Sequence, residues 1–317
     1  MDLLVNDLSL HGQFHDLAAF RNSVRQVMQI RQIARQHGRT LHCHRGLVSA
    51  QVTPDERMQS AVAALPRDEQ RAVMAWLGQH GPFWDDDRQH DSDDWYECAG
   101  ECVTDTAVGE AAHSRLHGIE RGLVSFRPSN FVYDPVPVER VVADDNRERV
   151  DLRNYWEPVA VEKCLAAAAP ALDSWGALRQ LSVSRFNGLR FAANAFEPAR
   201  SQPFQQGPAE RILARLDVLN RLTQCFDQSG SRNTDGHALY QQHFTGDKSW
   251  FSDSSDAEKA DFEKELTFPH PDVRGESLFC GWHGKIKSPQ FRIHFSWPVT
   301  AALPVYVVYI GPKITKR

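Results

Sequence analysis

Residues 277–317 contain no Asp or Glu. They carry six basic residues: Lys285, Lys287, Arg292, Lys313, Lys316 and Arg317. The whole chain has 41 acidic and 36 basic residues, so this tail has a formal charge of +6 and the remainder one of −11. Because a surface with one sign of charge attracts the opposite sign, the tail is predicted to bind an anionic partner.

The order of residues in the tail predicts a small antiparallel sheet. Alternate side chains of a β-strand point to opposite faces, and residues 282–287 and 291–297 both alternate between apolar and polar types. Pro289 favours a turn between them, and the apolar stretch 305–310 is typical of a covered central strand. One face of the predicted sheet is apolar, and the other, the basic face, carries His283, Lys285, Lys287, Arg292 and His294 without a carboxylate.

Two interpretations of the basic face compete. Lys and Arg solvate the open side of many antiparallel sheets. A solvated face normally mixes both signs, because like charges across a sheet are destabilising, whereas a phosphate-binding face tolerates one sign. We therefore expect nucleic-acid binding, RNA favoured, and keep an acidic protein partner as the alternative. The expected nucleic-acid contacts are Lys285, Lys287, Arg292, Lys313, Lys316 and Arg317.

The stretches 282–287, 291–295 and 305–310, followed by Lys313, resemble the C-terminal strands of RelE-type ribonuclease toxins. The resemblance implies a basic sheet that holds RNA and cleaves it without metal or cofactor, through attack of the 2′-hydroxyl on the adjacent phosphate. It also implies a role for each catalytic candidate: Lys285, Lys287 and Arg292 would stabilise the phosphorane. His283 or His294 would transfer protons, since imidazole titrates near neutral pH.

The N-terminal part has the pattern of an α/β layer. A short apolar strand is predicted over 3–5, and a helix over 14–37, where apolar residues recur with helical spacing until Gly38. Further helices are predicted over 58–65 and 67–79. Alternation of strands and helices indicates α/β packing.

The charged segment 144–153, which follows two prolines, marks the predicted domain boundary. We therefore predict an N-terminal α/β domain over residues 1–145. The second domain, residues 154–317, is predicted to contain a helical region and the small basic antiparallel sheet. The fold class expected for the whole chain is α+β or α/β.

Residues 85–101 form an acidic segment with a single basic residue, Arg88. Its acids are Asp85, Asp86, Asp87, Asp91, Asp93, Asp94, Glu97 and Glu101. A solvated loop is the simpler interpretation. A divalent-metal site is the alternative, because hard cations prefer several carboxylate oxygens.

The stretch 105–131 resembles the last helix and strand of PIN-type nucleases. In that family a carboxylate at the start of the helix binds the metal. The resemblance implies that Asp105 takes this role, with Asp7, just after the first predicted strand, as its partner.

The six cysteines include no C-x-x-C pair. A zinc site built from Cys98, Cys102 and residues 42–44 competes with the interpretation that we favour, reduced and partly buried thiols. Scattered free cysteines are typical of cytoplasmic proteins. With no signal-peptide pattern and no apolar run of about 18 residues, we expect a cytoplasmic protein without membrane contact.

The chain as a whole resembles uncharacterised bacterial proteins found near mobile elements and anti-phage genes. We predict a cytoplasmic nucleic-acid-binding protein, with a metal-independent ribonuclease effector of a defence or toxin-like system as the catalytic hypothesis. The alternative is a non-catalytic subunit of a larger defence complex, which docks nucleic acid or an acidic partner through the basic sheet. Convergence of His283, Lys285, Lys287 and Arg292 in one cleft would favour catalysis, and a flat exposed array would favour binding.

Overall fold

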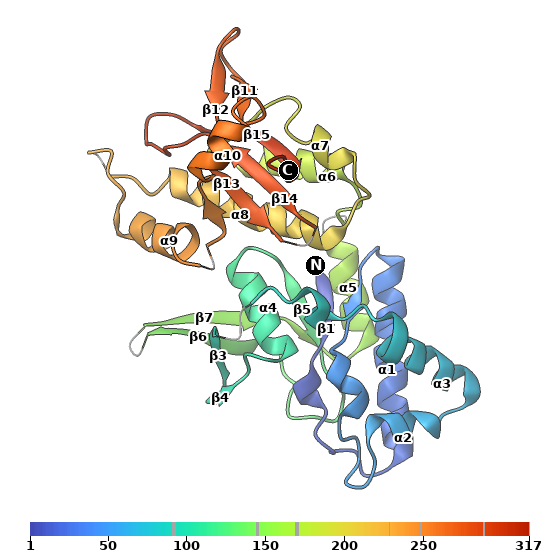
Figure 1. The fold of residues 1–317 in the computed structure, drawn as a ribbon. Coiled ribbons are helices and arrows are strands. Elements are labelled where there is room, and N and C mark those ends of the chain that lie inside the picture. Colours follow the sequence, from blue (N-terminus) through green and yellow to red (C-terminus); the bar gives the residue numbers. More distant parts are fainter. Residues whose placement is uncertain are drawn as a thin grey trace. The chain divides into compact units, whose positions relative to one another are not determined.

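The computed structural model in Figure 1 forms two compact units, Met1–Ala171 and Leu172–Arg317, here called unit 1 and unit 2. It describes all residues except 91, 92, 144, 145, 169, 170, 228, 248, 288 and 317. Two residues of the predictions above, Asp91 and Arg317, therefore lie outside the described residues. No helix in the described part of the chain is long and apolar enough to cross a membrane.

Unit 1 is built on a four-stranded parallel sheet in the order β2-β1-β5-β8. The strands are β1 (Asp2–Val5), β2 (Leu41–His42), β5 (Arg121–Val124) and β8 (Asn154–Tyr155). Leu3 and Val5 belong to one hydrophobic core, and Leu4 belongs to another. Since strand β1 is covered on both faces, its residues 3–5 are continuously apolar instead of alternating. The predicted first strand is confirmed.

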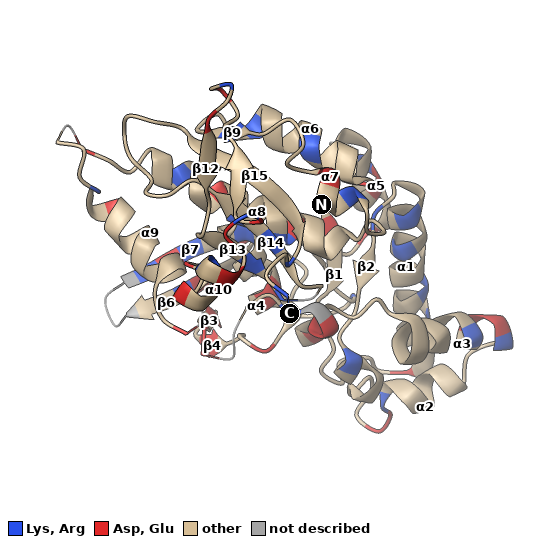
Figure 2. Ribbon diagram, turned by 45° about the horizontal axis from the view of Figure 1, so that its top comes forward, with Lys and Arg blue, Asp and Glu red and all other residues tan. Residues whose placement is uncertain are grey.

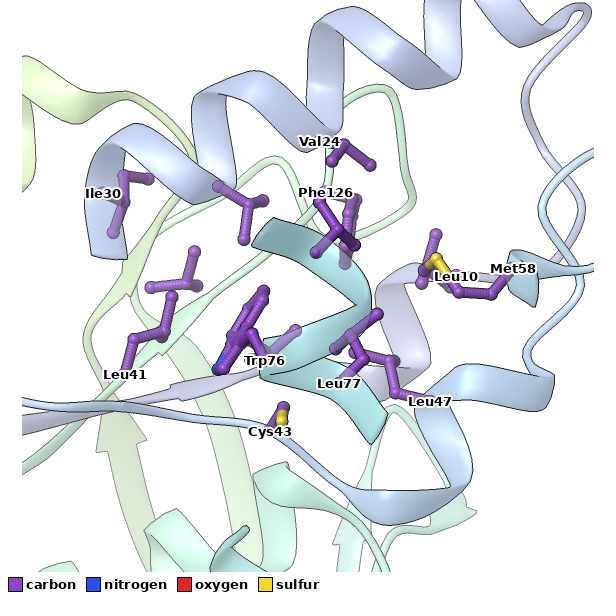
Figure 3. Close-up of a cluster of buried hydrophobic side chains, with 14 of the residues drawn as sticks. Leu10, Val24, Ile30, Leu41, Cys43, Leu47, Met58, Trp76, Leu77 and Phe126 are labelled. Atoms are coloured by element: carbon purple, nitrogen blue, oxygen red, sulfur yellow. The ribbon is translucent and has the colours of Figure 1, made fainter. Parts of the chain in front are cut away.

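The first core lies under helix α1 (Leu17–Gln36), which confirms the predicted N-terminal helix. Its N-cap residue Asp16 accepts a hydrogen bond from the backbone N–H of Ala19 at 2.7 Å. Figure 3 shows Val24 and Ile30 of α1 among the buried side chains that include Trp76 and Leu77. Trp76 and Leu77 come from η3 (Ala75–His80), a π-helical segment that continues α3 (Arg67–Met74). The other helices around this core are α2 (Met58–Ala63) and α5 (Pro158–Ala167).

The second core of unit 1 lies between helix α4 (Ala107–Leu116) and an antiparallel sheet of order β4-β3-β6-β7. The strands are β3 (Trp95–Cys98), β4 (Glu101–Cys102), β6 (Val136–Ala143) and β7 (Asn146–Leu152). The predicted boundary segment 144–153 contains strand β7, which pairs with β6, and the two units of the structure divide after Ala171 instead. In β7 the buried residues Val150 and Leu152 alternate with charged residues that face solvent. A strand of this kind is rich in charge and therefore has the composition of a linker.

Unit 2 contains a five-stranded sheet in the order β10-β13-β14-β15-β9. The strands are β9 (Leu189–Phe191), β10 (Phe251–Ser252), β13 (His283–Ile286), β14 (Phe291–Phe295) and β15 (Val305–Pro312). The three predicted strands of the tail pair in antiparallel fashion as expected. The prediction of a purely antiparallel sheet is wrong, because β9 joins β15 in parallel.

The apolar face of this sheet packs on helix α8 (Gln206–Thr223). Ile212, Leu216 and Leu219 of the helix are fully buried with Ile293 and Phe295 of the sheet. This packing confirms the predicted apolar face. The remaining elements of unit 2 are α6 (Trp175–Arg185), α7 (Glu197–Arg200), α9 (Thr234–Phe244), α10 (Asp256–Asp261), β11 (Thr267–Pro269) and β12 (Ser277–Phe279).

Candidate nucleic-acid interface

The basic face is formed by residues that lie opposite one another on β13 and β14. His283 is the partner of His294, and Lys285 is the partner of Arg292. Directly opposite residues on neighbouring strands project from the same face of a sheet. The centroids of the two imidazole rings are accordingly 5.4 Å apart. The alternation in the sequence thus predicted correctly which four side chains come together.

Both histidines are buried, with exposed fractions of 7% for His283 and 1% for His294. The Nδ1 atom of His283 lies 3.2 Å from the carbonyl oxygen of Gly281, and that of His294 lies 3.0 Å from the carbonyl oxygen of Cys280. A carbonyl oxygen only accepts, so Nδ1 carries the proton in both rings. Burial lowers the pKa of His283 to about 4 and that of His294 to about 3.

These imidazoles are poorly suited to the predicted proton transfers. A group with a pKa of about 3 or 4 is almost never protonated at neutral pH, so neither ring serves as a general acid there. The Nε2 atom of His294, the remaining basic nitrogen, is buried without a hydrogen-bond partner in the described structure. The catalytic roles expected for His283 and His294 therefore find no support in this geometry.

A carboxylate from outside the tail also approaches the basic face, which the sequence pattern did not predict. Glu258 belongs to α10, and Figure 1 shows this short helix next to β13. Its Oε1 atom lies 3.0 Å from Nζ of Lys313 and accepts a hydrogen bond from Oγ1 of Thr315 at 2.9 Å. The bond from Lys313 is the main reason why the pKa of Glu258 falls to about 2. Lys313 is therefore already paired, whereas Lys316 is exposed to solvent.

Four basic side chains gather around Lys285 of β13. They are Arg215, Lys285, Lys287 and Arg292, here called the cationic cluster. None of the four forms an ion pair with a carboxylate of the described residues. Burial and the neighbouring positive charges of Arg292, Lys287 and Arg215 lower the pKa of Lys285. The positive charges of the cluster therefore repel one another, and a bound anion would reduce this repulsion.

Hydrogen bonds hold the half-buried members of the cluster in place. Nζ of Lys285 donates to Oγ of Ser249 at 3.2 Å, and one guanidinium nitrogen of Arg292 donates to the carbonyl oxygen of Phe291 at 2.8 Å. The Nε–H of Arg292 is a buried donor without a partner among the described residues. Positioned cations with spare donors are what an oxyanion ligand requires.

Arg215 was not identified from the sequence. It lies on α8, and its Nε donates at 2.7 Å to the carbonyl oxygen of Lys285, 70 positions further along the chain. Its guanidinium carbon is 4.5 Å from the ring centre of Trp250, and burial together with Arg211 lowers its pKa to about 9. Helix α8 also contains Glu210, Arg211, Asp217 and Arg221, so its sequence alone does not single out Arg215.

The two residues predicted to bind metal in unit 1 have other partners. Asp7 accepts a hydrogen bond at 2.8 Å from the backbone N–H of Ala107, in the first turn of α4, and burial raises its pKa. Asp105 is 73% exposed at its side chain and forms an ion pair with Arg88 at 2.6 Å. Among the described residues, no three His, Cys, Asp or Glu side chains are arranged to hold a metal ion.

The cysteines likewise show no zinc arrangement in the described residues. All six are free, which agrees with the predicted reduced thiols. Burial raises the pKa of Cys43 to about 12, so this thiol stays protonated, whereas zinc binds thiolates.

The resemblances to RelE-type toxins and PIN-type nucleases stay predictions. Comparison of the chain with protein-family models, curated proteins and solved structures finds no match in any of the three.

Proposed function

We propose that unit 2 binds the sugar–phosphate backbone of a nucleic acid through the cationic cluster. The supporting observation is the gathering of four cations that form no ion pair with a carboxylate of the described residues. A phosphate group would replace mutual repulsion with attraction. Arg292 offers a planar guanidinium that matches two phosphate oxygens, and Lys285 and Lys287 act as point charges.

Single-stranded RNA is the nucleic acid that this site suits best. Trp250 is half-buried beside Arg215, and proteins that bind single strands combine cations for the backbone with aromatic rings for the bases. RNA is also the substrate that the resemblance of the tail implies. An acidic protein partner would use the same cations but would not need Trp250.

The proposal concerns binding and not cleavage. A metal-independent cleavage reaction needs an acid and a base that exchange protons near neutral pH. The buried, neutral histidines of the basic face do not meet this need. Holding a strand requires only the cations, which fits a subunit that docks RNA within a larger complex.

The test is the affinity for a labelled single-stranded RNA, measured by fluorescence anisotropy at several salt concentrations. The double substitution Lys285→Ala with Arg292→Ala is expected to weaken binding about 10- to 100-fold, since each charged hydrogen bond contributes about 1.5–3 kcal/mol. The slope of log K against log salt should fall by about 0.7 per lost phosphate contact. Arg179→Ala with Arg221→Ala, which removes two exposed arginines from α6 and α8, is the matched control.

An unchanged affinity and salt slope in the Lys285→Ala, Arg292→Ala protein would overturn the proposal. The same samples, incubated in EDTA and separated on a gel, test the ribonuclease hypothesis. Cleavage to 2′,3′-cyclic phosphate ends that disappears in His283→Ala would show that the buried imidazoles take part in chemistry after all.

A further inference from the structure

Helix α1 of unit 1 carries a second basic surface. Its 20 residues include four arginines and no acid, and Figure 2 shows several basic positions along it. Arg21 and Arg25 share a single carboxylate, because both lie within hydrogen-bond distance of Glu69 on α3. Arg31 and Arg35 have no carboxylate partner among the described residues. The charge of the helix is thus uncompensated at its C-terminal half.

This half of α1 borders a groove of about 740 Å³ between α1 and α3. The groove is lined by apolar side chains, amides, guanidinium groups and one carboxylate, that of Glu69, which is paired with Arg21 and Arg25. The apolar side chains are Val24, Met28, Ala72 and Val73; the amides are Gln29, Gln32 and Gln36; and the guanidinium groups are Arg25, Arg31 and Arg35. Pockets for small ligands typically measure about 300–1,000 Å³ and combine apolar walls with a few polar groups.

Arg31 is the groove residue at which an anion would be stabilised most. Its guanidinium carbon is 5.4 Å from the ring centre of Trp76, which is 2% exposed and is labelled in Figure 3. Burial, together with the charge of Arg35, lowers the pKa of Arg31. Like charges four positions apart destabilise a helix. The helix dipole stabilises the positive charge of Arg35, which lies in the last turn of α1. Arg31 lies outside that turn and gains no such stabilisation.

We propose that the groove binds a phosphate ester of nucleotide size. Arg31 and Arg35 bind the phosphate oxygens, since guanidinium groups form paired hydrogen bonds with phosphate. The glutamine amides supply donors and acceptors for the polar edge of a base, and Met28 and Ala72 supply an apolar surface for its flat face. A free phosphate ion would use only the arginines. A long RNA would extend beyond the groove, whereas the volume fits a single nucleotide.

Isothermal titration calorimetry of the full chain with ATP tests this site, with adenosine and inorganic tripolyphosphate as separate probes. We expect ATP to bind at one site and more tightly than either part alone. Arg31→Gln with Arg35→Gln is expected to weaken ATP binding about 10- to 100-fold. Arg71→Gln, at an exposed position of α3 outside the groove lining, should leave it unchanged.

Because Arg31 contacts the buried Trp76, its replacement also risks unfolding the unit. Gln32→Glu avoids that risk, since Gln32 is exposed and the new carboxylate repels phosphate. It should also weaken ATP binding at least several-fold. Equal affinity for ATP and tripolyphosphate, absence of ATP binding, or binding that neither variant changes would overturn the proposal. The Lys285→Ala, Arg292→Ala protein should bind ATP normally, which separates this site from the RNA interface.

Discussion

The acidic segment of unit 1 and the basic tail of unit 2 are each conspicuous for one sign of charge, but the structure treats them differently. Arginines from other parts of the chain pair with the acids: Arg45 with Asp86, Arg140 with Asp94, and Arg147 with Glu97. In the tail Glu258 pairs with Lys313, while the cationic cluster forms no ion pair with a carboxylate of the described residues, and Glu258 interacts with Arg292 only as a neighbouring charge. A run of like charges indicates a binding site only where the fold leaves it uncompensated.

The strongest test of the difference between the two regions is how the free energy of unfolding of unit 2 depends on pH. His283 and His294 stay neutral in the folded protein until the pH reaches about 4 and about 3, but in the unfolded chain they protonate near pH 6.5. Stability is therefore full above about pH 6.5 and falls as the pH is lowered. As the pH is lowered, each histidine reduces the free energy of unfolding by up to about 1.4 kcal/mol per pH unit.

Urea unfolding between pH 7 and 5 measures this slope. His294→Asn should flatten it, even if the substitution lowers stability at every pH. His237→Asn, at an exposed position of α9, is the control and should keep the slope of the original protein. If His294→Asn has the same slope as the unaltered chain, burial does not hold this imidazole neutral.

A smaller effect is expected when the tail loses its carboxylate. Glu258→Gln removes the negative charge beside Lys313 and close to Arg292, so the affinity for single-stranded RNA should rise a few-fold at low salt. Asp86→Asn removes an exposed acid from unit 1 and should not change RNA affinity. Equal increases in both variants would mean that net charge, and not the local cluster, governs binding.

The smallest effect is expected from divalent metal. Asp105 and three acids of the 85–101 segment already pair with arginines, so millimolar Mg²⁺ or Mn²⁺ should leave the thermal midpoint of unit 1 unchanged. A rise in the midpoint that Asp7→Asn or Asp105→Asn abolishes would restore the metal-site interpretation and break the comparison between the two regions.

Elements governed by a local repeat were predictable. The helical spacing of apolar residues located α1, and the period of two assigned the faces of β13 and β14. The strand β7 was not predicted, because a strand with alternating charges has the same composition as a solvated connection. Strand β9 was missed because three residues carry too little pattern, and only its pairing with β15 defines it.

The sequence by itself determined which side chains share the basic face, because strand geometry depends only on alternation. Tertiary structure decided their chemistry. Burial made His283 and His294 neutral, α10 brought Glu258 to Lys313, and α8 brought Arg215 to Lys285. The physical reason is that charge and pKa depend on solvent exposure and on neighbours distant in sequence, which no local repeat encodes.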